Sequence, residues 1–189
     1  MIAAREVWRK IAHVFLGMLV LGSAWWVAQT FGQDVLETST LVLLLVLVLC
    51  DVLIADYKQK LPVYSWLERP HEERTFHTVT LAVLAGFFAF KLFVLPVALA
   101  GVSMFIFGDA AAALVGKKWG RRELGKKSWA GTAAMFVVSA LVGWAILGWI
   151  GIVMALVATL AECLVTKIDD AVTIPLFAGA VGQLLIHFL

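Results

Sequence analysis

The sequence has little charge, little cysteine and no low-complexity tract. Only 15% of its 189 residues are charged and 62% are apolar, whereas roughly a quarter of the residues in a soluble domain are charged. The mean hydropathy is +0.97. This shortage of charge excludes an ordinary soluble domain. It predicts an integral, multi-pass membrane protein with a single domain covering residues 1–189.

The two cysteines, Cys50 and Cys163, both lie in apolar segments, which argues against a disulfide framework. The first apolar segment follows basic residues, as in a secretory signal peptide. Six later apolar segments, and polar residues within the first one, favour a retained membrane span. A lipid bilayer is therefore the expected environment, and no nucleic-acid partner is expected.

Apolar segments that approach the thickness of a bilayer predict an all-α bundle of about seven transmembrane helices. They cover residues 11–29, 38–56, 76–91, 93–115, 129–147, 149–166 and 172–189. The least marked boundary is the break between the third and fourth of these, because one bent helix across Lys91 to Pro96 would fit the same pattern.

The basic residues predict how this bundle is oriented. With a cytoplasmic N-terminus, only Lys91 of the 15 Lys and Arg residues falls in a connection on the outer face, as the positive-inside rule requires. All polar clusters would then share the cytoplasmic face of a cell membrane or an endoplasmic reticulum-type membrane, and the C-terminus would lie outside. The longest loop, 57–75, suits an interfacial segment or a solvated connector.

The rest of the chain is organised around the stretch from Phe107 to Thr132, FGDAAAALVGKKWGRRELGKKSWAGT. An apolar helix with one carboxylate, Asp109, leads through a basic loop to a second apolar helix. An ionised carboxylate inside a bilayer costs roughly 2.5–3.5 kcal/mol on the insertion scale. Asp109 must therefore face a wet cavity or a cation, and a buried ion pair is the structural alternative. Gly108 and Gly116 belong to a small-residue stripe that permits close helix packing.

The basic loop is predicted to cradle phosphate. Residues 120–126, GRRELGK, fit part of a P-loop, but no strand precedes them and Lys127 stands where Ser or Thr is needed, so we reject a P-loop. Ser128 is expected to cap the next helix, whose N-terminal amides would face the phosphate. Topological charge and contact with anionic lipid are the alternative roles. The candidate phosphate-binding residues here are Gly116, Lys117, Gly120, Lys126, Lys127 and Ser128.

In the first helix, Arg9, His13 and Gly17 recur every four residues and share one face, with Lys10 beside them. His13 lies within the span and is a candidate site residue. Arg9 and Lys10 are candidates for binding an anionic ligand, although they could be topology markers only. A pair between Glu6 and Lys10 would be a plain structural explanation for both.

Three further acids, Glu162, Asp169 and Asp170, lie at the end of the sixth predicted helix and in the turn after it. Glu162 is intramembrane and needs a partner for the same reason as Asp109. Two adjacent acids beside a basic loop suggest oxygen ligation of a divalent metal, taken to be Mg²⁺. Asp169 could instead cap the last helix. The predicted metal ligands are Asp109, Asp169 and Asp170.

Carboxylates, a helix N-terminus and a basic cradle at one membrane surface suit phosphoryl transfer, because that chemistry depends on positioning and charge neutralisation. The residues by themselves therefore predict a membrane enzyme that handles a nucleotide or a phospholipid headgroup with Mg²⁺.

Five blocks along the chain carry a family resemblance. They are EVWRKIAHVFLG (6–17), HEER (71–74), GDAAAALVGKKWG (108–120), GKKSWAGT (125–132) and ECLVTKIDDAVTIPL (162–176). In this order they resemble the CTP-dependent lipid kinase family: dolichol kinases, phytol and farnesol kinases, and CTP-dependent diacylglycerol kinases. A more distant similarity is to phosphatidate cytidylyltransferases.

The resemblance implies that the γ-phosphoryl group of CTP is transferred to a lipid alcohol, which is a polyprenol or dolichol, a phytol-like alcohol or diacylglycerol. It implies that Asp109 and one or both of Asp169 and Asp170 hold Mg²⁺ on the phosphates. It adds Gly108 and Gly131 to the nucleotide-binding residues. The general base for the lipid hydroxyl would be an acid of the 169–170 pair, Glu162 or His13.

Two positions depart from the family pattern. Ala130 stands where the family usually has Glu, and Ala171 stands where it usually has Asn, so two polar groups are missing from the expected site. Two alternatives therefore stay open: a cytidylyltransferase that makes a CDP-lipid, and a catalytically impaired protein that binds nucleotide or lipid. A homodimer is also open, because small-residue stripes can pack within one chain or between two.

Overall fold

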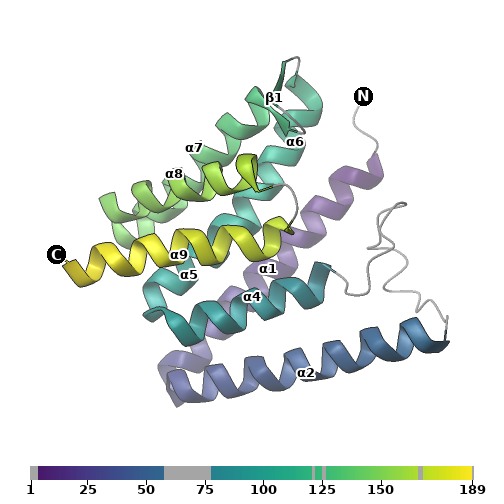
Figure 1. Cartoon of the computed structure of the whole chain (residues 1–189), viewed down its shortest axis with the longest axis vertical. Helices are drawn as coiled ribbons and strands as arrows, with labels where there is room; N and C mark the ends of the chain where they lie inside the picture. The colour runs from purple at the N-terminus through teal and green to yellow at the C-terminus, as the bar shows by residue number, and fades with distance from the viewer. Residues whose placement is uncertain (1–3, 58–77, 121, 125–126, 166–167, 189) are drawn as a thin grey trace.

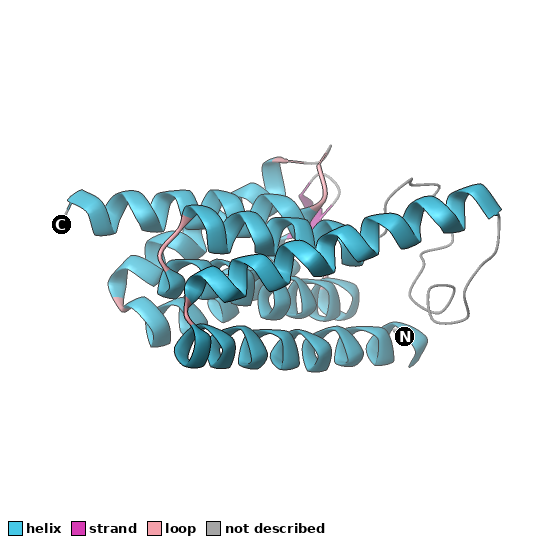
Figure 2. Ribbon diagram, turned by 90° about the horizontal axis from the view of Figure 1, so that it is seen from below, coloured by secondary structure: helices cyan, strands magenta, loops and turns pink. Residues whose placement is uncertain are grey.

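The structure is a computed structural model that describes residues 4–57, 78–120, 122–124, 127–165 and 168–188. Within these ranges the chain is almost entirely helical, which confirms the predicted all-α class. The helices run back and forth between two ends of an elongated bundle (Figure 1), and the chain termini lie at opposite ends in two views (Figures 1 and 2). The predicted blocks HEER (71–74) and Lys126 lie outside the described residues, as does all of the 57–75 loop except Tyr57.

Each predicted helix has a helical counterpart among the described residues. The helices are α1 (Ala4–Phe31), α2 (Gln33–Tyr57), α4 (Thr78–Leu92), α5 (Leu95–Ser103), α6 (Asp109–Trp119), α7 (Trp129–Leu147), α8 (Trp149–Leu164) and α9 (Asp170–Phe188). A π-helix, η1 (Met104–Gly108), joins α5 to α6 in one continuous run. Five segments are long and apolar enough to cross a membrane, whereas α4 and α8 are shorter apolar helices. The count of about seven spans and the cytoplasmic N-terminus therefore stay predictions.

The break between α4 and α5 is present where the sequence placed it. Helix α4 ends at Leu92, and Val94 has extended backbone angles (φ −60°, ψ 146°) before α5 begins. Pro96 lies in the first turn of α5, where its missing N–H removes no intrahelical hydrogen bond. Close to this break, Lys91 donates a hydrogen bond to Glu37 at 2.6 Å, so the one basic residue predicted on the outer face has an acidic partner.

The π-helix was not predicted from the sequence. It occupies the five residues directly before Asp109, within a run that the sequence analysis treated as one regular helix. A π-turn contains an extra residue, so it changes the face on which the following side chains lie, and such turns are frequent at functional sites. The direction of the Asp109 side chain is therefore set by a local irregularity.

A short antiparallel strand pair follows α6. Strand β1 (Glu123–Leu124) pairs with β2 (Lys127–Ser128), and Ser128 then precedes the first residue of α7. The Ser128 hydroxyl accepts a hydrogen bond from the Gly131 N–H at 3.2 Å. This bond satisfies one of the unpaired amides of the first turn, and it confirms the predicted cap.

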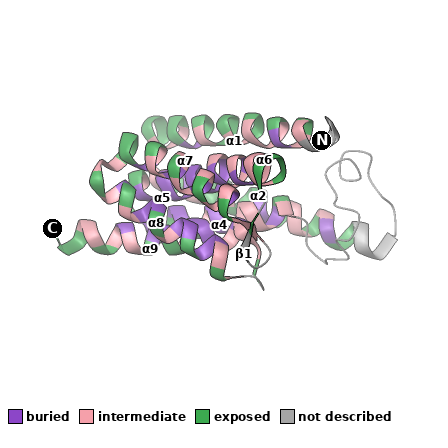
Figure 3. Ribbon diagram, turned by 90° about the horizontal axis from the view of Figure 1, so that it is seen from above, coloured by how far each residue is buried: buried purple, intermediate pink, exposed green. Residues whose placement is uncertain are grey.

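Small residues and methionines form the core between α5, η1, α7, α8 and α9. Met104, Met135 and Met154 are completely buried. Helices α7 and α8 approach so closely that a Cβ added at Gly151 would lie 2.0 Å from the Gly143 carbonyl oxygen. By contrast, α1 and α2 expose most of their large apolar side chains (Figure 3). This exposure suits a surface that faces lipid.

Candidate active site

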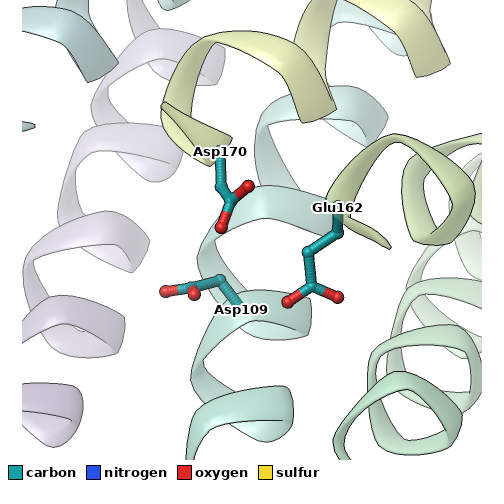
Figure 4. A group of neighbouring side chains, drawn as sticks. All are labelled: Asp109, Glu162 and Asp170. Atoms are coloured by element: carbon teal, nitrogen blue, oxygen red, sulfur yellow. The ribbon is translucent and has the colours of Figure 1, made fainter. Parts of the chain in front are cut away.

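Three carboxylates from three different helices meet at one end of the bundle. Asp109 begins α6, Glu162 lies in the last turn of α8 and Asp170 begins α9. One oxygen of each lies within 4.8 Å of the others, and Figure 4 shows the three side chains converging. Along the chain, 53 positions separate Asp109 from Glu162, so tertiary packing alone makes the cluster.

The cluster fits a divalent metal ion. Glu162 is only 2% exposed, and its Oε2 atom has no hydrogen-bond partner among the described residues. A buried carboxylate oxygen without a donor is costly, and a cation would remove that cost. Mg²⁺ prefers carboxylate oxygens and uses few protein ligands. The three acids therefore offer the donor set that Mg²⁺ requires.

Two lysines contact these acids. The Lys127 ammonium donates to Glu162 Oε1 at 2.9 Å and to Asp170 Oδ2 at 2.8 Å. The Lys10 ammonium, on a side chain that is almost fully buried, pairs with Asp109 Oδ2. The buried ion pair that was the structural alternative for Asp109 is thus present. Lys10 and Lys127 place two positive charges in direct contact with the carboxylates.

Lys127 keeps its charge over the whole ordinary pH range. Burial by itself would lower the pKa of the Lys127 ammonium, but the neighbouring carboxylates of Glu162 and Asp170 outweigh burial and raise this pKa above its usual value of 10.5. A group whose folded-state pKa is raised stabilises the fold fully below its unfolded pKa. That contribution is lost only as the pH rises through the folded-state value. Lys127 therefore stays protonated at neutral pH.

Asp169 has a different position from its neighbour Asp170. Its Oδ1 atom accepts a hydrogen bond from the Ala171 N–H at 3.0 Å, and its carbonyl oxygen accepts from the N–H groups of Val172 and Thr173. It thus caps α9, which was the alternative role considered for it. Asp169 also lines the cavity described below. The three-acid cluster, however, contains Glu162 where the predicted ligand set had Asp169. Its role as a metal ligand stays a prediction.

A cavity of about 670 Å³ connects the acid cluster to a long apolar space. Its polar end brings together eight predicted site residues from four parts of the chain: Arg9, Lys10, His13, Asp109, Lys127, Glu162, Asp169 and Asp170. The His13 ring packs edge-on against Phe105, with ring centroids 5.3 Å apart. The remaining walls are mostly apolar side chains of α1, α2, α4 and α5. No sequence signal indicated this apolar portion, because its residues are ordinary Leu, Val and Ala.

The predicted nucleotide-binding glycines are used for packing between α6 and α7. A Cβ at Gly116 would lie 2.9 Å from Ser128 Oγ, and one at Gly131 would lie 2.9 Å from the Ala112 carbonyl oxygen. A Cβ at Gly120 would lie 2.6 Å from the same Ser128 hydroxyl. At Gly108 it would meet Met135 and Ser139. These close contacts explain the four glycines without a ligand.

Several predicted residues are not part of the cavity wall. The described residues that line it do not include Gly108, Gly116, Gly120, Gly131, Lys117, Ser128, Ala130 or Ala171. Lys117 is exposed near the end of α6, and Ala171 is completely buried. Contact of Lys117, Ser128 and the glycines with a nucleotide stays a prediction.

Comparison with known proteins finds relatives that are named as phytol kinases or probable phytol kinases. A phytol kinase from Synechocystis is 31% identical over 144 residues, which cover 72% of this chain and 57% of that protein. A probable chloroplastic phytol kinase from Triticum aestivum is 34% identical over 111 residues, which cover 48% of this chain and 37% of that protein. A second plant protein of this kind, from Glycine max, is 33% identical over the same length.

The chain spans 57% of the Synechocystis protein and less than half of the plant proteins. No family model matches the sequence, and no solved structure matches it either.

Proposed function

Because this chain belongs to the lipid alcohol kinase family that includes the phytol kinases, we propose that it transfers the γ-phosphoryl group of CTP to a lipid alcohol. A phytol-like isoprenoid alcohol is the first acceptor to test, since the relatives are named for phytol. One observation carries the proposal. The same cavity contains a carboxylate cluster with lysines at one end and apolar walls along the rest of its length.

Asp109, Glu162 and Asp170 are the proposed Mg²⁺ ligands, because their oxygens already converge and Glu162 Oε2 has no partner among the described residues. This set differs from the one expected from the sequence, in which Asp169 took the place of Glu162. When bound, Mg²⁺ would neutralise charge on the phosphate oxygens. The three residues would hold the ion at the polar end of the cavity.

Lys10 and Lys127 are the proposed phosphate-binding cations. Each ammonium group contacts a carboxylate of the cluster. A rotation of the lysine side chain would therefore bring it to a phosphate bound beside the cluster. Arg9 lines the same end of the cavity. Phosphoryl transfer passes through a transition state with charge spread over three oxygens, and fixed ammonium groups at that point stabilise it.

In the proposed reaction, the hydroxyl oxygen of the lipid alcohol forms a bond to the γ-phosphorus of CTP. The bond between that phosphorus and the β–γ bridging oxygen breaks, and CDP leaves. The hydroxyl proton passes to a base that lines the polar end of the cavity, either His13 or an acid of the cluster. The products are a lipid monophosphate and CDP.

The test is a product assay on the purified full chain in lipid nanodiscs with γ-labelled CTP or ATP and phytol, farnesol, dolichol or diacylglycerol. We expect label in the lipid product and unlabelled CDP from CTP, with little transfer from ATP. Asp109→Asn is the matched control, because it removes one charge while keeping the side-chain shape. Transfer from neither nucleotide would refute the kinase. In a parallel arm with a lipid monophosphate as acceptor, release of pyrophosphate with formation of a CDP-lipid would show a cytidylyltransferase instead.

A further inference from the structure

We propose that the apolar part of the cavity, between α1, α2 and α4, holds the hydrocarbon chain of the lipid alcohol, and that Gly86 sets the chain length that fits. This inference rests on the proposed function, because it assigns the acceptor of that reaction to a place in the fold. It assigns a role to wall residues that carry no chemical motif. The space is continuous with the acid cluster, so a chain lying in it would present its hydroxyl to Asp109, Glu162 and Asp170.

The walls of this space suit a hydrocarbon. They consist mainly of Leu16, Gly17, Val20, Ala24 and Val27 on α1, Leu36 and Leu43 on α2, Val79, Ala82, Val83, Gly86 and Phe90 on α4, and Val102 on α5. Three of the hydroxyl side chains that also line the space donate to a carbonyl of their own helix. The bonds run from Ser23 to Val20 (2.9 Å), from Ser39 to Leu36 (2.9 Å) and from Thr40 to Leu36 (2.7 Å).

The space is long and borders the surface that faces lipid. From Lys10 at the polar end to Val27, the wall follows α1 for about 25 Å at the usual helical rise. The two helices that form its outer wall, α1 and α2, bury few of their side chains. A membrane-dissolved alcohol can therefore enter between loosely packed helices, while the nucleotide comes from the aqueous end.

The polar end of the cavity can receive a hydroxyl group. Asp109, Glu162, Asp169 and Asp170 line it, and a hydroxyl can donate a hydrogen bond to a carboxylate oxygen. The proposed occupant of the apolar space is thus a long-chain alcohol whose hydroxyl lies beside these acids, and a bilayer phospholipid is the competing occupant that the experiment tests.

Gly86 is the wall position where a side chain would extend into the space without a clash. A Cβ added there would have its nearest neighbour, a Phe90 ring carbon, at 3.9 Å. Gly17 also lines the space, but its Cβ would lie 2.5 Å from Ile106. Along α4, Gly86 is about 12 Å beyond Thr78 at the usual helical rise. A long chain must therefore pass Gly86, whereas a short chain ends before it.

The experiment compares Gly86→Leu and the milder Gly86→Ala with the parent, all as full chains in nanodiscs, using phytol and the much shorter geraniol. Gly22→Leu is the matched control, because Gly22 is exposed on α1, does not line the cavity, and a Cβ added there would have no neighbour within 4 Å. We expect Gly86→Leu to raise the KM for phytol about 10-fold or more, because one extra methylene in an apolar pocket already changes discrimination between substrates by about that factor. The KM values for geraniol and CTP should stay unchanged, with Gly86→Ala intermediate.

The inference would be overturned if the ratio of the KM for phytol to the KM for geraniol were unchanged in both Gly86 variants. It would also be overturned if Gly22→Leu changed this ratio as much as Gly86→Leu. A second readout does not depend on catalysis: a photoactivatable phytol analogue should label peptides of α1, α2 and α4, and Gly86→Leu should reduce that labelling. Such labelling in a protein without kinase activity would support the lipid site while refuting the proposed function. Labelling elsewhere, or labelling displaced by phospholipid but not by phytol, would overturn the site even in an active kinase.

Discussion

Asp169 and Asp170 are neighbours in the sequence but have different partners in the structure. The Asp170 carboxylate meets Asp109, Glu162 and the Lys127 ammonium. The Asp169 carboxylate accepts the Ala171 N–H and so caps α9. The two adjacent side chains therefore have different hydrogen-bond partners, although both line the same cavity.

This difference predicts unequal effects of the two isosteric changes. Asp170→Asn should lower kcat at least about 100-fold, because removing one charge-stabilising group from an active site typically lowers kcat by that factor or more. Asp169→Asn should cost less than about 10-fold, because Asn and Asp are equivalent helix N-caps. Initial rates measured over a Mg²⁺ titration check this. Equal losses, with equal weakening of the Mg²⁺ response, would restore the ligand set expected from the sequence.

At the scale of elements, close helix packing depends on glycine at a few contact points. Helix α8 packs against α7 where Gly151 faces Gly143, and their backbones are in direct contact. Helix α8 also carries Glu162 near its other end. The position of one acid of the site therefore depends on a backbone contact at the far end of the same helix.

Gly151→Ala should destabilise the protein by about 1–3 kcal/mol, the usual cost of overpacking a tight interface. The added Cβ would lie 2.0 Å from the Gly143 carbonyl oxygen, which is backbone and cannot rotate away. Thermal unfolding in detergent measures the change. Gly22→Ala is the control, because its Cβ would meet nothing within 4 Å, and Ala is favoured over Gly in a helix interior. A melting temperature for Gly151→Ala at or above that of the parent would contradict the packing argument.

At the scale of the whole molecule, the connections alternate between the two ends of the bundle. The turns that follow α1, α4 and α7 lie at one end, and the β1–β2 pair lies at the other (Figure 1). Among the described residues, Arg9, Lys10 and Lys127 line the cavity together with the acid cluster, whereas Lys91 lies close to the break between α4 and α5. This arrangement is compatible with the predicted cytoplasmic position of the site, and membrane topology can be tested directly.

In a variant without its two native cysteines, Leu92→Cys should react with a membrane-impermeant maleimide in intact cells, because α1, α2 and α4 would then have crossed the membrane. Arg122→Cys should react only after permeabilisation, since the α5–α6 run returns the chain to the cytoplasmic face. Both side chains are exposed. Labelling of the two positions from the same side would contradict the predicted order of spans, and reversed labelling would contradict the orientation.

The sequence by itself determined the features that depend on local physics. Its low charge and long apolar runs predicted the all-α class, and Ser128 was identified as the cap of α7. The break between α4 and α5 was predicted near Lys91 to Pro96, with one bent helix as the alternative. Each is decided within a few residues, by hydropathy, by a missing N–H or by one side-chain hydrogen bond. The five sequence blocks also identified the kinase family to which the relatives belong.

Only the tertiary structure decided which groups meet. The contact between Lys10 and Asp109 joins residues 99 positions apart, and the choice of Glu162 for the acid cluster depends on how α6, α8 and α9 pack. The glycines expected to cradle a nucleotide are used for helix contact, because the same lack of a Cβ serves either purpose. The apolar cavity was likewise invisible in the sequence, since a side chain that lines a space is the same type as one that fills it.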